Sequence, residues 1–164
     1  MGIAKVLYEE GIKQIVIMPD SLISKCINER ELECYGVEVI QVLNESDAVC
    51  ICSGLNLTGQ NVVCMMENSG IRSACDIISR FELAHGIHNI FVLTNRGKIG
   101  EENWWGVYHN EVTGQILKVT RMNIISVKSL SAFQCALHNA IKTFKTEQKS
   151  VAILLEYSFF EEFL

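Results

Sequence analysis

Apolar positions along this chain fall into two alternating patterns. Short continuous apolar runs, rich in β-branched residues, are typical of buried strands and lie at residues 14–18, 37–43, 61–66, 89–94, 124–127 and 151–156. Between these runs, apolar residues recur every three or four positions, which indicates helices with one buried face. Strands separated by helices need crossover connections, which place helices on both faces of a mostly parallel sheet. The pattern therefore predicts an α/β fold, a three-layer sandwich around a six-stranded mostly parallel sheet.

Chain length, hydrophobic content and net charge narrow the class of protein further. The chain has 164 residues, of which 49% are hydrophobic, and this is enough for one well-filled core and too little for two ordinary domains. We therefore expect residues 1–164 to form a single domain. The net charge of -5 argues against a nucleic acid or an anionic membrane as the main partner. No apolar run is long enough to cross a bilayer, and residues 1–8 do not resemble a signal peptide.

The cysteines and histidines do not form a metal-binding pattern. The seven cysteines are an odd number without a CxxC and lie in apolar segments, so we expect small buried side chains in a reducing, cytoplasmic compartment. His85 and His88 straddle the break at Gly86, and His109 and His138 stand alone, so no metal ligand is predicted. The sequence also lacks GxxxxGK[ST] and a GxGxxG after the first strand, which removes the usual ATP and dinucleotide sites.

The segment from residue 37 to residue 59 joins a strand directly to a helix, with an acidic residue at the junction. Asn44 is a good N-cap, and Glu45 follows it at the carboxyl end of the strand. In a parallel sheet this is the edge where ligands bind, so the position favours a functional role for Glu45. A structural role is the alternative, because an acid in the first turn complements the helix dipole and Asn44 with Asp47 imitates a capping box. Position alone leaves both roles open.

Three further polar corners follow predicted strands. The first strand ends at Pro19, and Asp20 comes next, where it can cap the following helix. The third strand leads into a polar turn made of Glu67, Asn68, Ser69 and Gly70. The fourth strand is followed by a long glycine-rich loop over residues 96–114, and loops of this length in compact domains are usually functional or at an interface.

Four motifs at these corners, taken in order, resemble one family. They are MPDSLIS (18–24), NESDAV (44–49), ENSG (67–70) and NRGKIGEEN (95–103). They resemble the pyrimidine-binding domain of thiamine diphosphate enzymes and, more narrowly, the sulfopyruvate and phosphonopyruvate decarboxylases, in particular the separate alpha subunit of sulfopyruvate decarboxylase. The likeness runs over nearly the whole chain, and the family's fold is a parallel α/β sandwich.

The resemblance implies a catalytic and cofactor-binding role for Glu45. In the family, this glutamate contacts N1′ of the aminopyrimidine of thiamine diphosphate and, by sharing a proton with it, favours the imino tautomer. Asp20 matches a catalytic aspartate near the reacting carbon, where it can assist proton delivery. Asn68, Ser69 and Gly70 match a polar turn beside the cofactor, and Asn68 also lies on the substrate side of that turn.

The long loop adds two candidate substrate-binding residues. Arg96 and Lys98 can bind the anionic groups of a 2-keto acid, Arg96 through a bidentate fork, and a solvated cationic loop is the alternative. Glu67 departs from the family's pattern because it replaces a glutamine. Other departures are Arg72, which replaces a small residue, and the adjacent tryptophans Trp104 and Trp105, which we expect to form a partner surface or an active-site lid.

The resemblance also implies a second chain. The family binds the cofactor's diphosphate through Mg²⁺ at a GDG sequence followed by an asparagine, and no such sequence occurs here. Thiamine diphosphate would therefore be shared with a beta subunit that carries the diphosphate and Mg²⁺, in a heterotetramer or larger assembly.

The implied function is the alpha subunit of a decarboxylase, a carbon-carbon lyase that is inactive without its partner. Its substrate would be an acidic 2-keto acid such as sulfopyruvate or phosphonopyruvate. A carboligase subunit using the same cofactor is one alternative. A non-catalytic regulatory or interaction protein with the same fold is another, and a flavodoxin-like small-ligand binder is the third.

Overall fold

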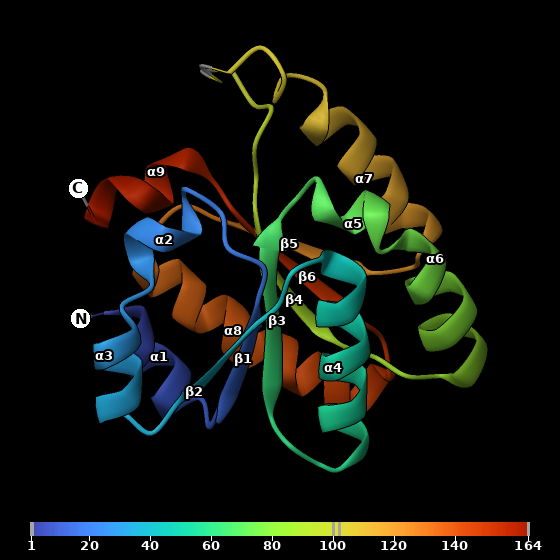
Figure 1. The fold of residues 1–164 in the computed structure, drawn as a ribbon, viewed down its shortest axis with the longest axis horizontal. Helices are drawn as coiled ribbons and strands as arrows, with labels where there is room; N and C mark the ends of the chain where they lie inside the picture. The colour runs from blue at the N-terminus through green and yellow to red at the C-terminus, as the bar shows by residue number, and fades with distance from the viewer. Residues whose placement is uncertain (1, 100, 102, 164) are drawn as a thin grey trace.

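Six parallel strands form the centre of the computed structural model, which describes residues 2–99, 101 and 103–163. The strands are β1 (Gln14–Ile17), β2 (Glu38–Gln41), β3 (Val62–Glu67), β4 (Ile90–Thr94), β5 (Asn123–Val127) and β6 (Val151–Leu155). Their order in the sheet is β2-β1-β3-β4-β6-β5, and each neighbouring pair is parallel (Figure 1). The predicted α/β class is confirmed, and the sheet is parallel throughout the described strands.

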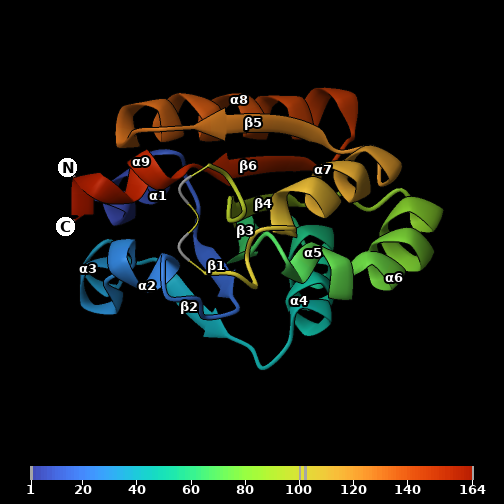
Figure 2. The same ribbon diagram turned by 90° about the horizontal axis from the view of Figure 1, so that it is seen from above.

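Helices cover both faces of the sheet because successive residues of a buried strand point to opposite sides. In β1, Ile15 and Ile17 belong to one core and Val16 to the other. The first core is covered by α1 (Ile3–Glu9), α2 (Ile23–Cys26), α3 (Glu29–Cys34), α8 (Leu130–Glu147), α9 (Tyr157–Phe160) and η2 (Glu161–Phe163). The second is covered by α4 (Glu45–Leu57), α5 (Gly70–Ser73), α6 (Cys75–Ile77), η1 (Ile78–Leu83) and α7 (His109–Val119). Figure 2 shows the two sets of helices on either side of the sheet.

Two expectations from composition can be compared with the structure. All seven cysteines are free, and Cys26, Cys52 and Cys64 are buried as expected. The expectation is wrong for the exposed Cys34, Cys50 and Cys135, because they lie on the solvent-facing sides of α3, α4 and α8. Within the described part of the chain, no helix combines the length and the apolar character needed to cross a membrane.

The segment after β3 is not one continuous helix. It forms the short helices α5 and α6, followed by η1, which is a π-helical turn. Such wider turns are rare and usually have a local cause. Here η1 carries Glu82, whose side chain lies inside the protein with only 1% of the residue exposed. Helical periodicity alone does not show that this acid is buried.

Glu82 belongs to a buried polar network near the amino end of β4. This edge of the sheet is opposite to the carboxyl ends of the strands. Glu82 Oε1 accepts hydrogen bonds from Asn89 Nδ2 and from Ser53 Oγ, the latter at 3.3 Å, while Asn89 Oδ1 accepts one from Asn56. Its Oε2 has no partner among the described residues. Burial raises the pKa of Glu82 to about 7, although the hydrogen bonds from Asn89, Ser53 and Ser150 act in the opposite direction.

This raised pKa predicts a pH-dependent contribution to stability. Between the usual pKa of 4.5 and the folded pKa of about 7, the folded protein holds a proton that the unfolded chain has lost, so stability falls as pH rises through this window. In wild type, this fall in the free energy of unfolding with rising pH should be on the order of 3 kcal/mol, and in Glu82→Gln it should be absent. Urea unfolding at a series of pH values measures it, with the exposed Glu33→Gln as the matched control. Parallel pH profiles for Glu82→Gln and wild type would contradict the prediction.

Candidate functional site

The predicted site residues lie at the carboxyl ends of the strands, which point upward in Figure 1. Glu45 is the first residue of α4 and is half-buried. Asn44 caps the helix, because its side chain accepts a hydrogen bond of 2.9 Å from Asp47 N. The capping role considered for this corner is thus performed by Asn44 and Asp47. The carboxylate of Glu45 instead accepts a hydrogen bond of 2.8 Å from Ser73 Oγ.

Gly70 makes this arrangement of Glu45 possible. A Cβ atom at Gly70 would lie 2.5 Å from Glu45 Cγ and 2.9 Å from Met66 Sδ, which is closer than real Cβ contacts allow. The glycine therefore lets α5 approach the start of α4 and hold the carboxylate against the polar turn. Glu45 and Gly70 were predicted independently from two corners of the chain, and the structure brings them into direct contact.

Arg96 lies at the centre of a second cluster at the same edge. It follows β4, and its side chain is only 5% exposed. One terminal nitrogen lies 3.2 Å from Asp20 Oδ1 and 2.6 Å from Ser21 Oγ, and the other lies 3.8 Å from Glu101 Oε1. Its Nε lies 2.9 Å from Glu67 Oε2, a close ion pair without the alignment of a hydrogen bond. The guanidinium is thus surrounded by carboxylates from the end of β3 and from the loops after β1 and β4.

The charges in this cluster do not cancel. Three carboxylates face one guanidinium, so the cluster carries excess negative charge. Burial by itself would lower the pKa of Arg96, but the carboxylates of Asp20 and Glu67 outweigh this effect and raise it. His109 lies beside the same cluster, with Nδ1 3.1 Å from Glu67 Oε1, and adds a positive charge when it is protonated.

Glu101 organises the long loop after β4, and sequence reasoning did not select it. Its carboxylate accepts hydrogen bonds from Gly97 N at 3.1 Å, from Asn103 N at 3.0 Å and from the hydroxyl of Tyr157. Burial would raise the pKa of Glu101, but these hydrogen bonds lower it to about 2. Burial and the bond to Glu101 raise the pKa of Tyr157 to about 12. The residue is part of the 95–103 motif, of which Gly100 and Glu102 lie outside the described residues.

The polar turn after β3 connects the two clusters. Asn68 is buried, and its Nδ2 donates a hydrogen bond of 2.9 Å to the carbonyl of Arg96, so it fixes the start of the long loop. Ser69 Oγ donates to Glu67 Oε1 at 2.6 Å. The turn therefore begins in the Arg96 cluster at Glu67 and ends at Gly70 against Glu45.

The other predicted residues of the long loop lie farther out. Lys98 is about half exposed, and its Nζ lies 3.5 Å from Glu156 Oε1. The ring of Trp105 covers the guanidinium of Arg96, with 5.3 Å from Cζ to the ring centroid, whereas Trp104 is 86% exposed. Adjacent in sequence, the two tryptophans thus face different surroundings.

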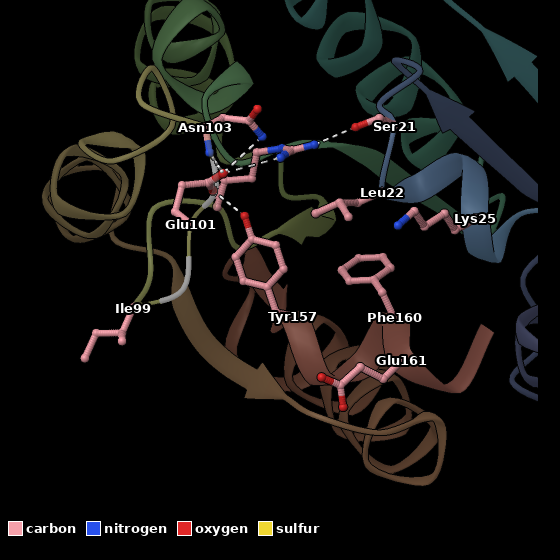
Figure 3. A pocket seen from close by; sticks show the side chains of 10 residues that line it. Ser21, Leu22, Lys25, Ile99, Glu101, Asn103, Tyr157, Phe160 and Glu161 are labelled. Atoms are coloured by element: carbon pink, nitrogen blue, oxygen red, sulfur yellow. Dashed lines mark hydrogen bonds and ion pairs between the residues drawn. The ribbon is translucent and has the colours of Figure 1, made fainter. Parts of the chain in front are cut away.

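A cavity of about 540 Å³ opens beside the Arg96 cluster, between α2, the long loop and the C-terminal segment (Figure 3). It is lined by Ser21, Leu22, Lys25, Arg96, Ile99, Glu101, Asn103, Tyr157, Phe160 and Glu161. The lining is mixed, with apolar and aromatic groups beside charges of both signs. Such a lining suits a small polar molecule with a short carbon chain.

Comparisons with known proteins find relatives of low sequence identity. No family model matches the chain. The chain is similar to the alpha subunit of sulfopyruvate decarboxylase from Methanococcus maripaludis, with 20% identity over 160 residues that cover 98% of this chain and 95% of that protein. It is 21% identical over 120 residues to the corresponding subunit from Methanothermobacter thermautotrophicus, covering 73% of each protein.

A solved structure extends the comparison to the fold. A chain of a split gene transketolase, in an inactive beta4 tetramer, matches with a TM-score of 0.71 at 15% identity. The chain has a transketolase-like fold. The match covers 95% of this chain and 50% of the transketolase chain, so this chain corresponds to about half of that protein's length.

The burial of Arg96 predicts that it is important for stability. Replacing it with methionine should lower the free energy of unfolding by about 3 kcal/mol or more at neutral pH, because the facing carboxylates lose their counter-charge. Urea unfolding measures this loss. Lys98→Met is the matched control and should cost less than about 1 kcal/mol, since its ion pair is exposed. Equal stability of the two variants at neutral pH would refute the prediction.

Proposed function

We propose that this chain is the alpha, pyrimidine-binding subunit of a two-chain thiamine diphosphate-dependent decarboxylase that acts on an acidic 2-keto acid. In this proposal residues 1–164 form one domain, which works in the cytoplasm with a beta subunit in a heterotetramer or larger assembly. The observation that carries the proposal is Glu45, a half-buried carboxylate at the ligand-binding edge of a parallel sheet, held by Ser73 and packed against Gly70. The similarity to sulfopyruvate decarboxylase alpha subunits supports it.

The residues at the Glu45 corner fit an aminopyrimidine. The carboxylate is held in place by Ser73, is not needed for helix capping, and lies beside a glycine that leaves no side chain over it. Within the described residues, Asn68 Oδ1 is buried without a partner, so it can accept a hydrogen bond from an added group. Bound thiamine diphosphate would supply the carbanion that attacks the keto carbon and would accept the electrons released with carbon dioxide.

Glu45 would hold a proton at N1′ of the pyrimidine. Ser73 donates to one carboxylate oxygen and leaves the other for N1′. The residue therefore positions and exchanges one proton without moving from its corner.

Asp20 is held through one carboxylate oxygen. Its Oδ1 accepts a hydrogen bond of 3.1 Å from Leu22 N in the turn before α2 and another from Arg96. The expected cap is not formed, because the N-cap position of α2 is Leu22, which has no side-chain hydrogen bond to the helix. Asp20 Oδ2 is buried and has no partner among the described residues. We propose that this second oxygen delivers a proton during the reaction, while Arg96 holds the carboxylate still. Arg96 is then a positioning residue, because its own nitrogens are occupied within the chain.

The diphosphate and Mg²⁺ would be bound by the beta subunit. No group of three histidine, cysteine or acidic residues suited to a metal ion occurs in the described part of this chain. Apolar side chains of the long loop are exposed beside the site, and they are Ile99, Trp104, Val107 and Tyr108. An exposed apolar group of this kind is typical of an interface, and the proposal assigns it to the beta subunit.

Replacing Glu45 tests the proposed proton role. In the complex with the beta subunit, Glu45→Gln should lower kcat by about 100-fold or more, because an amide cannot exchange the proton. Assembly measured by sedimentation should be unchanged. Asp47→Asn, in the same helical turn, is the matched control and should retain activity. Full turnover by Glu45→Gln would reject the role.

Replacing Trp104 tests the proposed partner surface. Trp104→Ala should weaken association with the beta subunit by about tenfold or more, since buried tryptophans dominate many interfaces. Calorimetric titration of the two subunits measures the dissociation constant. Leu57→Ala, an exposed apolar residue at the far end of α4, is the control and should bind as wild type does. If Trp104→Ala binds the beta subunit with unchanged affinity, this surface is not part of the interface.

A further inference from the structure

The cavity in Figure 3 lies beside three cations, and they differ in what they already bind. Arg96 is buried, with a carboxylate or hydroxyl against each of its nitrogens and the Trp105 ring over its plane. Another anion would have to displace one of these partners and add to the excess negative charge. Arg96 is therefore a poor ligand for a substrate anion.

Lys98 is also engaged within the chain. Its Nζ pairs with Glu156 at 3.5 Å, and the residue does not line the cavity. The side chain is exposed enough to remain mobile, but its charge is already balanced. The two cations selected from the sequence as substrate ligands thus both have carboxylate partners.

Lys25 is different. It lies on α2 and lines the cavity, and Figure 3 shows its amine turned toward the space beside Leu22 and Phe160. Among the described residues, no carboxylate lies within 4.0 Å of it. Glu161 lines the same cavity, but the ring of Phe160 lies between the two groups in this view.

We propose that Lys25 binds the distal anionic group of the substrate. This inference rests on the proposed function and adds the residue that selects the substrate. Leu22, Tyr157 and Phe160 provide apolar walls for the short carbon chain, and the ammonium group provides three donors for the oxygens of a sulfonate, phosphonate or second carboxylate. Ser21 also lines the cavity and contacts Arg96 beside Asp20, so the proposal places the keto acid end on the Ser21 side.

The test compares two substrates in the reconstituted complex. Sulfopyruvate carries the distal anion, and 2-ketobutanoate has a neutral group in its place. Lys25→Met should raise KM for sulfopyruvate about tenfold with little change in kcat, since the lost contact is a charge-assisted hydrogen bond that is partly exposed to water. KM for 2-ketobutanoate should stay within about twofold. Lys25→Arg should restore sulfopyruvate binding, and the exposed Lys142→Met on α8 should change neither substrate.

A second measurement needs neither the partner nor turnover. In the isolated full-length chain with ¹³C-dimethylated lysines, the NMR signal of Lys25 should shift on titration with sulfopyruvate and stay in place with 2-ketobutanoate. If the Lys25 NMR signal shifts but the complex shows no turnover, the anion site would be supported and the proposed function would be rejected. If the complex is active and Lys25→Met changes KM equally for both substrates, or for neither, the inference would be overturned and the proposed function would stand. Absence of the NMR shift with sulfopyruvate would overturn the inference as well.

Discussion

The guanidinium of Arg96 holds together the edge of the sheet at which the strands end. Parallel strands all end at one edge of the sheet, so Glu67 at the end of β3 meets acids from the loops after β1 and β4 there. Without a cation between them, Asp20, Glu67 and Glu101 would repel one another in a region largely shielded from water. Their shared contact with Arg96 joins the end of β3 to both loops and forms part of the wall of the neighbouring cavity.

The edge has two parts with different tasks. On the side of α4 and α5, Glu45 is held by a hydroxyl and a glycine and keeps its carboxylate near the surface. On the side of α2 and α9, the Arg96 cluster is largely buried. The turn from Glu67 to Gly70 belongs to both parts, because Glu67 contacts Arg96 and Gly70 lies against Glu45.

Much of the fold could be predicted from the sequence because strong local signals agreed with it. The apolar runs match all six strands, and Asn44 caps α4 as expected. The π-helical turn at Glu82 and the exposed Cys34, Cys50 and Cys135 were not predicted, because burial of a single residue depends on what packs against it. Local patterns fix the periodicity of a segment and leave such tertiary choices open.

The site could be predicted only in part, for a similar reason. The corners that carry Asp20, Glu45 and Gly70 are visible as polar residues after apolar runs. The partners of Arg96 are not, because an arginine in a glycine-rich loop has the same local sequence whether it faces solvent or three acids. Glu101 was missed because its role depends on Tyr157, at the other end of the chain. The nearest sequence signal was its position inside the 95–103 motif.

The central claim is that Glu45 forms this chain's half of a thiamine diphosphate site completed by a second chain. The most direct measurement is a crystal structure of the assembled subunits with thiamine diphosphate and Mg²⁺. The predicted result is a Glu45 carboxylate oxygen within hydrogen-bonding distance of N1′ of the pyrimidine, at the interface between the subunits. A pyrimidine ring bound by another acid, with Glu45 still facing only Ser73, would contradict the claim.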